Sequence, residues 1–430
     1  MQTSGGPGNG TGERGAHVRF VMTEALGSLG DLGTFVPLVV GMTQIVGLDA
    51  GTVLVFAGLA NVVAGVVFRV PMAVQPMKAI AALAIAGAMS AGQVGVAGLT
   101  VGVAMLLIGG LGLAGTLHRA VPRPVLSGLQ LVLALQLVLS GLQLALSVSG
   151  TGPLRPLGGP DGLLVTLGAF ALVLLLHRRA QWTALALTAV GLVGAYVNNP
   201  SLLQTLRVSA WQPRWMSLDS SALAGVWLGG LPQMPLTVLN SVLAVSALGA
   251  TLFPGTGFRG TPRSLAVSVG LMNVVACPLG GMPMCHGSGG LAGQYRLGAR
   301  SGLSMVILGT AKLTLGLLFG GVALAWMRAF PPTVLGVFLV VAGAALAAAS
   351  RPWEARQDLL ALAAMVLLHR ATGSLVASFV IGWTVCVLSR RRQMRPQPAG
   401  VLPARVAGRA GSSPGADSGQ DPRVEVGAGA

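Results

Sequence analysis

Apolar stretches close to 20 residues long recur along nearly the whole chain. A helix of about 20 apolar residues is long enough to cross a hydrocarbon core of about 30 Å. Apolar types make up 53% of the 430 residues and charged types only 9%, whereas soluble globular proteins carry about 25% charged residues. The sequence therefore predicts an all-α polytopic membrane protein. It excludes a soluble enzyme and a single-span receptor.

About fourteen segments of this kind can be delimited. Their approximate ranges are 30–47, 50–68, 76–91, 94–117, 123–148, 161–177, 181–197, 225–248, 262–281, 288–297, 301–326, 332–349, 357–370 and 373–389. The third and the tenth are too short or too interrupted to be ordinary spans, so we expect broken spans at these two places.

The segments divide into two sets of seven. We expect spans 1–7 within residues 18–200, an external linker at 201–224 and spans 8–14 within residues 225–389. The Gly-rich residues 1–17 predict a disordered tail, and the basic residues 390–430 predict a disordered cytoplasmic tail. No signal-peptide pattern precedes the first span, so we expect no cleavage.

The formal net charge of +16 is carried mainly between the apolar segments and in the tails. With the N-terminus in the cytoplasm, eleven loop arginines fall inside and five fall outside; the five are Arg155, Arg207, Arg214, Arg328 and Arg370. This bias follows the positive-inside rule and predicts that both termini are cytoplasmic. It explains the charge without a nucleic-acid partner. The bias towards Arg, Ala and Gly indicates a GC-rich coding sequence, and we expect a bacterial inner-membrane protein.

The three cysteines, Cys277, Cys285 and Cys386, all lie in apolar segments. They form neither a disulfide framework nor a metal-ligand spacing. We therefore expect no metal site and no cofactor. No P-loop is present in the sequence, so any energy for transport would come from an ion gradient.

An internal repeat links the two sets of segments. Residues 61–72 read NVVAGVVFRVPM and residues 273–284 read NVVACPLGGMPM, with six of twelve positions identical. GSLGDLGTFVP at 27–37 and GGLPQMPLTVL at 229–239 are more weakly alike. Chance likeness between Val- and Ala-rich helices is the alternative, but Asn and Pro-Met match as well as the aliphatic residues. An offset of seven spans predicts an inverted repeat, a plan common in secondary transporters.

Each repeat leads into a short extended piece followed by a helical piece. In the first half, Pro76 suits the first position of a helix that continues through Lys78. In the second half, Ser288 suits the cap of a helix. Non-helical backbone at membrane depth is tolerated where it lines a protein cavity, and paired interrupted segments indicate a transporter's binding site.

The chemistry expected at this crossing is that of an anion site. Each helix N-terminus contributes roughly half a positive charge. Two such ends and the Lys78 ammonium together supply a charge of about +2, which suits a dianionic oxyanion better than a neutral solute. The glycines around Ser288 allow the backbone to approach a ligand closely.

Each charged or titratable candidate has a second interpretation. Lys78 either serves the site, extends to a membrane interface or pairs with a carboxylate such as Asp31. Asp31 is a lysine partner, a proton acceptor or a helix cap. His286 binds substrate, titrates with a coupled proton or makes structural hydrogen bonds.

The neutral candidates are Gln75, Gln233, Thr34 and Ser288. Gln75 is placed to donate to an oxyanion. Gln233 and Thr34 lie near the starts of the repeat-related spans. Ser288 is a ligand donor, a cap or both. Lys312 is interpreted as a packing or interfacial residue and is left out of the site.

The motifs that surround these residues resemble those of a known family. PMAVQPMKAIAA (71–82) and PMCHGSGGLAGQYRLGARSG (283–302) are similar to the two signature motifs of the molybdate transporter family, within the sulphate permease superfamily. GSLGDLGTFVPL (27–38) and GLPQMPLTVLNSVLAV (230–245) resemble its first-span and eighth-span signatures. The resemblance covers about residues 20 to 390, and only the motifs are specific.

The resemblance implies a uracil-permease type of fold with seven plus seven inverted spans. Spans 1–4 and 8–11 would form a core domain, and spans 5–7 and 12–14 a gate domain. It implies uptake of molybdate by a homodimer that lacks the cytoplasmic STAS domain of typical sulphate permeases. The site implied on this chain comprises Gln75, Pro76, Met77 and Lys78 opposite His286, Gly287, Ser288 and Gly289, with Asp31, Thr34 and Gln233 close by.

We therefore expect a secondary active importer of molybdate with no catalytic residues and with Asp31 and His286 as proton-coupling candidates. A carrier of sulphate or another oxyanion is the nearest alternative, and competition by tungstate is left open. A nucleobase permease is disfavoured because that branch places carboxylates on spans eight and ten, whereas Gln233 stands here. A membrane enzyme using Cys285 and His286 is disfavoured because adjacent residues of an extended segment point to opposite sides.

Overall fold

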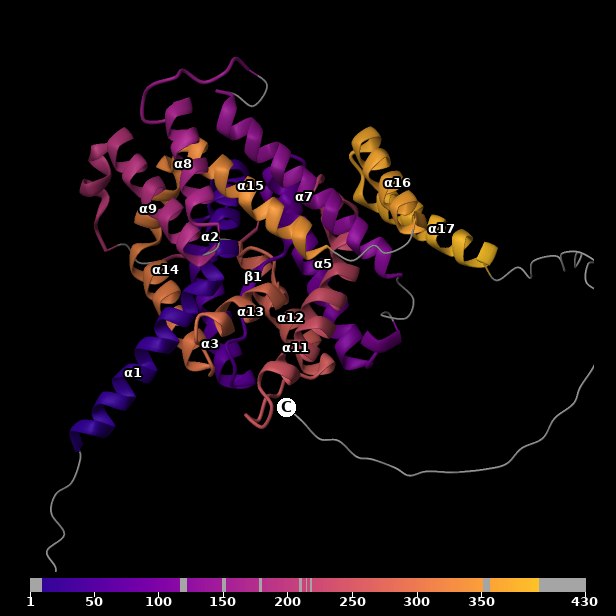
Figure 1. Ribbon diagram of the computed structural model, residues 1–430, viewed down its shortest axis with the longest axis horizontal. Helices are drawn as coiled ribbons and strands as arrows, with labels where there is room; N and C mark the ends of the chain where they lie inside the picture. The colour runs from indigo at the N-terminus through magenta and orange to yellow at the C-terminus, as the bar shows by residue number, and fades with distance from the viewer. Residues whose placement is uncertain are drawn as a thin grey trace, which may run out of the picture. The chain divides into compact units, whose positions relative to one another are not determined.

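The computed structural model describes residues 10–116, 122–148, 152–177, 180–208, 211–213, 215–216, 219–350 and 356–393. The described chain is built mostly of helices, with two short strands among them (Figure 1). Residues 1–389 form one unit by their contacts, and almost all of the second unit, 390–430, including its predicted tail, lies outside the described residues.

The elements of the first half are α1 (Gly10–Ser28), η1 (Leu29–Asp31), α2 (Leu32–Gly41), η2 (Met42–Val46), α3 (Ala50–Phe68), β1 (Val74–Pro76), α4 (Lys78–Ile85), α5 (Ala91–Gly110), α7 (Arg123–Leu146), α8 (Leu163–Leu175), α9 (Ala180–Asn198) and η3 (Pro200–Thr205). Those of the second half are η4 (Ala222–Ala224), η5 (Val226–Gly230), α10 (Leu231–Leu236), η6 (Thr237–Leu243), α11 (Ala244–Leu252), α12 (Pro262–Ala276), η7 (Cys277–Leu279), β2 (Met284–His286), α13 (Ser288–Arg296), α14 (Leu303–Ala329), α15 (Pro332–Ala349), α16 (Arg356–Thr372) and α17 (Leu375–Gln393).

Seven helical stretches in the described part of the chain are long and apolar enough to cross a membrane, and five shorter apolar helices accompany them. The fold is therefore that of a multi-pass membrane protein. The strand–helix segments β1–α4 and β2–α13 occupy the third and tenth places in the order of segments. The number of crossings stays a prediction.

Two segment boundaries differ from those expected from the sequence. Helix α1 begins at Gly10, so residues 10–17 are helical rather than disordered. No proline interrupts the chain between Gly10 and Ser28, so the helix extends beyond the apolar span. The helical stretch Ala222–Leu252 begins inside the range 201–224, which the sequence predicts to be a linker.

Contacts between the two halves hold the molecule together. Helix α3 packs on α14, α5 on α12 and α7 on α15. Glycines make the first contact close: a Cβ added at Gly58 would lie 2.6 Å from the carbonyl oxygen of Gly309, and a Cβ added at Gly309 would lie 2.6 Å from that of Gly58. Small residues permit this approach between membrane helices, where packing replaces the hydrophobic effect.

The strands β1 and β2 pair antiparallel near the middle of the helices, beside α13 (Figure 1). Gln75 lies opposite Cys285 in the register. Asn273 of α12 holds β2, because its Nδ2 donates to the Met284 carbonyl at 2.6 Å and its Oδ1 accepts from the Met284 amide at 2.7 Å. The extended backbone is thereby hydrogen-bonded within the protein. Backbone groups inside a membrane need such partners, because the hydrocarbon core offers no water.

Both predicted helix starts are wrong by one or two residues. Pro76 is the last residue of β1, and α4 begins only at Lys78. Ser288 is the first residue of α13 and makes no capping bond, because Gly287 occupies the cap position. The pairing of the strands keeps these residues extended, and a pairing between segments about 210 residues apart leaves no local signal.

The helical stretch Ala222–Leu252 contains two π-helical segments, η5 and η6, on either side of α10. Pro232 and Pro235 lie in α10. A proline donates no backbone hydrogen bond, so the regular pattern cannot pass through it. Short π-helical segments within α-helices are often found at functional sites.

Candidate functional site

A cavity of about 160 Å³ lies where the two strand–helix segments meet. Lys78, the first residue of α4, and Ser288, the first residue of α13, both line it. The backbone N–H groups of a first helical turn have no partners within the helix and attract negative charge. Two helix N-termini therefore open on one cavity.

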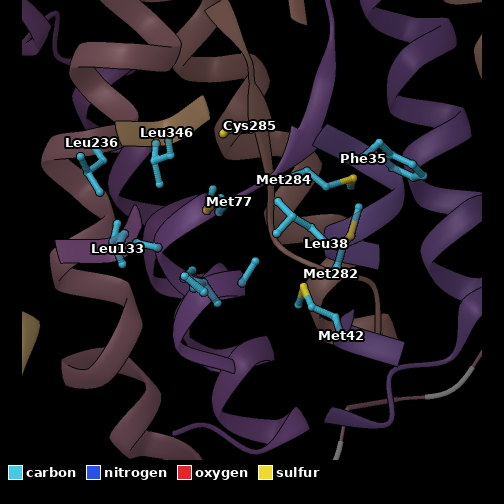
Figure 2. Packing of buried hydrophobic residues seen from close by; sticks show 14 of the residues in the cluster. Phe35, Leu38, Met42, Met77, Leu133, Leu236, Met282, Met284, Cys285 and Leu346 are labelled. Atoms are coloured by element: carbon cyan, nitrogen blue, oxygen red, sulfur yellow. The ribbon is translucent and has the colours of Figure 1, made fainter. Parts of the chain in front are cut away.

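Apolar side chains form part of the wall. In the view of Figure 2, Leu133, Leu236 and Leu346 lie to one side of Met77, and all three line the cavity. Leu133 belongs to α7 and Leu346 to α15, whereas Leu236 ends α10. The site thus lies between the strand–helix segments and the packed pair α7–α15.

Lys78 provides the charge of the site. Its side chain is half-buried and lines the cavity. Within the described ranges no hydrogen bond or ion pair is found for its ammonium group. The two alternatives, pairing with Asp31 and extension to an interface, are therefore disfavoured.

Asp31 pairs with a different lysine. Its Oδ2 lies 3.6 Å from Lys312 Nζ, and both side chains are buried. Lys312 Nζ also donates to Asn61 Oδ1 at 3.0 Å and lies 3.5 Å from the centroid of the Phe35 ring. Lys312 is buried within the helix bundle and does not line the cavity, which fits the packing interpretation and not the interfacial one, but its pairing with Asp31 was not predicted. A lone lysine inside an apolar segment is the signal that could have identified it.

Gln75 connects this buried pair to the cavity. Its Nε2 donates to Asp31 Oδ1 at 2.6 Å, and its Oε1 has no hydrogen-bond partner in the described structure. Gln75 itself lines the cavity. A Cβ added at Gly290 would lie 2.6 Å from Gln75 Nε2, and one added at Gly287 would collide with Gln75 Oε1. The amide of Gln75 fills the space beside Gly287, and Gln75 together with Ala73 fills the space beside Gly290.

Gln233 also lines the cavity, and its side chain binds the N-terminus of α4. Its Oε1 accepts from the backbone amide of Ala79 at 2.9 Å, and its Nε2 donates to Thr237 Oγ1 at 3.0 Å. It thereby satisfies one of the N–H groups in the first turn of α4. Gln233 fixes the position of that turn against α10.

His286 and Cys285 face opposite sides of β2. The ring of His286 is buried, with Nδ1 3.3 Å from the Ala73 carbonyl and Nε2 3.0 Å from Ser268 Oγ. Cys285 lies beside Ser241 and Lys78. Both residues contribute to the cavity lining. Since both imidazole nitrogens are occupied, the arrangement favours a structural role for the His286 side chain.

The remaining predicted residues divide into two groups. Gly287 and Gly289 line the cavity with Ser288. Pro76 pairs with Met284 in the strands, Met77 packs in the hydrophobic core, and Thr34 is half-buried on α2; none of these three lines the cavity.

Three polar residues of the lining were not predicted: Gln130 of α7 and Asn240 and Ser241 of η6. Asn240 and Ser241 fall inside the motif at 230–245, which could have indicated them. Gln130 is a polar residue in an otherwise apolar helix, and only the packing of α4 against α7 brings it to the site.

Comparison with known proteins identifies the family. The family model described as "Molybdate transporter of MFS superfamily" matches residues 23–137 and 225–346. The chain belongs to this molybdate transporter family. Molybdate transporter 2 of Arabidopsis thaliana is 34% identical to this chain over 412 residues. The match covers 86% of this chain and 88% of that protein. Molybdate transporter 1 of Chlamydomonas reinhardtii is 34% identical over 470 residues, covering 82% and 89%.

Solved structures show the fold of the transporter. The transmembrane domain of the cyanobacterial bicarbonate transporter BicA matches with a TM-score of 0.58 at 15% identity, covering 85% of this chain and 98% of that domain. Murine Slc26a9, an anion transporter in its inward-facing state, matches with a TM-score of 0.63 at 12% identity, covering 91% and 74%. Although the family description names the MFS superfamily, the fold of this chain is the one found in BicA and Slc26a9.

Proposed function

We propose that the transporter is a secondary active importer of molybdate and that the dianion binds in the cavity between the N-termini of α4 and α13. The observation that carries this proposal is the Lys78 ammonium, which lines the cavity without a partner in the described structure. The names of the relatives, all at 34% identity, support molybdate as the substrate.

The charges around the cavity fit a dianion. Two helix N-termini and one ammonium supply about two positive charges. No carboxylate is among the described residues that line the cavity. Ser288 and Asn240 add groups that can donate hydrogen bonds to oxyanion oxygens. A neutral base, by contrast, would leave the ammonium buried without a counter-charge.

The arrangement of the helices supports the proposed inverted repeat of residues 18–200 and 225–389. The pairs α3–α14 and α5–α12 each join one half to the other, and shifting α3 and α5 by 212 residues places them on α12 and α14. We propose that α7 and α15 belong to a gate that moves against the strand–helix segments, because they supply the opposite wall of the cavity.

The number of spans, their orientation and the oligomeric state are supported by the sequence. The arginine bias supports fourteen spans with both termini in the cytoplasm of a bacterial cell. A homodimer and competition by tungstate or sulphate belong to the same proposal. Chemical catalysis is not part of it, because the sulfur of Cys285 and the ring of His286 contact different neighbours.

Uptake by purified protein in proteoliposomes tests the substrate. We expect saturable molybdate uptake that tungstate blocks and that excess sulphate and uracil do not. Lys78→Ala should abolish it, while Gln204→Ala should not, because Gln204 is an exposed residue of η3 that does not line the cavity. Equal competition by sulphate would indicate a general oxyanion carrier. No oxyanion uptake by the unsubstituted protein would remove the substrate assignment.

Proton coupling is a separate part of the proposal. Asp31 is a buried acidic group that accepts a hydrogen bond from Gln75, which lines the cavity. If protons are coupled, an inward pH gradient should drive molybdate accumulation, and Asp31→Asn should retain exchange of molybdate without accumulation. Uptake that ignores an imposed pH gradient would exclude coupling.

A further inference from the structure

A second cavity, of about 330 Å³, lies between α7, α16 and the end of α4. Its polar lining consists of Gln136, Ser140 and Gln143 from α7 and His369 and Arg370 from α16. No carboxylate is among the described residues that line it. A polar cavity of this kind between apolar helices requires an explanation, because polar side chains within membrane helices usually face water or a ligand.

The polar residues of α7 form one face of that helix. Gln136, Ser140 and Gln143 follow one another at spacings of four and three residues, which places them above one another on an α-helix. Gln130, earlier on the same helix, lines the central cavity. Helix α7 therefore presents polar groups first to the central cavity and then to the second cavity.

The two cavities lie at opposite ends of α4. Lys78 at its N-terminus lines the central cavity, and Ala86 just beyond its C-terminus lines the second. A helix of this length spans about 12 Å. On α7 the adjacent residues Val132 and Leu133 line the second and the central cavity respectively. The two linings therefore adjoin on α7, with apolar side chains at the boundary.

The α16 side of the second cavity carries its positive charge. Arg370, in the last turn of α16, is exposed and is the charged group among the described lining residues. The neighbouring His369 is 9% exposed, and its Nε2 lies 3.1 Å from Gln136 Oε1. His369 Nδ1 lies near the Ser374 backbone, yet it makes no hydrogen bond within the described structure.

We propose that the second cavity is an oxyanion-binding vestibule that holds molybdate before it passes to the central site. This proposal rests on the proposed function. Arg370 attracts the anion, since a guanidinium binds oxyanions through several parallel N–H groups. Gln136 and Ser140 replace part of its hydration shell. Passage to the central site then requires the apolar layer at Leu133 to separate.

Transport kinetics provide the first test, with Arg328 as the matched control. Arg328 is also an exposed arginine in the last turn of a membrane helix, α14, but it does not line the second cavity. Because an entry charge acts mainly on association, Arg370→Gln should raise the KM for molybdate about three- to tenfold at low ionic strength, with little change in the maximal rate. The increase should shrink in high salt. Arg370→Lys should keep most of the affinity.

Equal effects of Arg370→Gln and Arg328→Gln would show a general surface potential and would overturn the proposal. An unchanged KM in Arg370→Gln would also overturn it.

Thiol labelling of purified protein provides a test that does not depend on transport. Ser140→Cys should react faster with a negatively charged methanethiosulfonate than with a positively charged one, above the background of the unsubstituted protein. Molybdate should slow the reaction, and it should still do so when Lys78→Ala is added. Protection that disappears with Lys78→Ala would place the anion only in the central cavity and would overturn the vestibule. Protection without any molybdate uptake by the unsubstituted protein would leave the vestibule standing and remove the proposed function.

Discussion

Asp31 Oδ2 lies 3.6 Å from Lys312 Nζ, and both side chains are buried. The other lysine of the chain, Lys78, stands in the central cavity with no partner in the described structure. The two lysines thus divide two tasks. One neutralises a buried carboxylate that holds Gln75, and the other remains available to a substrate anion.

Substitution of the two lysines should separate stability from transport. Lys312→Met leaves Asp31 buried without its counter-charge, which typically costs about 3–5 kcal/mol. Lys78→Met removes a cation that has no partner, so the fold should be affected little while molybdate uptake is lost. Thermal unfolding in detergent measures the first effect and proteoliposome uptake the second. A lower Tm for Lys78→Met than for Lys312→Met would contradict the assignment.

The double variant Asp31→Asn/Lys312→Met completes this comparison. Removing both charges together should destabilise less than Lys312→Met alone, because no unpaired charge remains buried. Additive losses would show that the two side chains act independently.

Sequence motifs indicated the two segments that line the central cavity, because the residues that mark each segment are close together in the sequence. Gln75 and Lys78 lie within four residues of each other, and so do His286 and Gly289. The lone lysines, the glycines and the interrupted helices are each visible as departures from apolar periodicity. The family motifs therefore indicated the two segments that meet at the central cavity.

The partners of these residues could not be predicted in the same way. The contact between Asp31 and Lys312 joins segments 281 positions apart in the printed sequence, and composition cannot choose between two lysines. The orientation of His286 depends on the strand register, which places its ring towards Ser268 and Phe68. Gln130 reaches the cavity only because α4 packs against α7. Such contacts are set by tertiary packing, for which a single sequence carries no periodic signal.

Gly287→Ala should disrupt the site directly. The added methyl group would collide with Gln75 Oε1, so the amide must turn away from Asp31 or the strands must separate. Molybdate uptake should fall by more than about tenfold, because small displacements of binding groups cost affinity steeply. Gly168→Ala on α8 is the control, since nothing lies within 4 Å of its added Cβ. Equal uptake by the two variants would show that Gln75 has room to move.

Gln233→Glu tests the sign of the charge that the cavity accepts. The carboxylate keeps an acceptor for the Ala79 amide, so α4 should stay in place. It also introduces a negative charge beside the anion, and like charges in a desolvated site repel strongly. The KM for molybdate should rise at least about tenfold. As a control, Gln204→Glu at an exposed position should leave uptake unaltered. A normal KM in Gln233→Glu would mean that the anion binds elsewhere.

Asn273→Ala should loosen the strand pair. The Asn273 side chain satisfies both the amide and the carbonyl of Met284 in a fully buried position. Each buried backbone group left unpaired costs about 1–3 kcal/mol, so the variant should unfold at a lower temperature. The neighbouring Cys285 should also become accessible to thiol reagents, since β2 no longer holds its register. Asn199→Ala, on an exposed turn, controls for the loss of an amide. If Asn273→Ala kept both its Tm and the protection of Cys285, the strands would be held by their own pairing with β1 and not by α12.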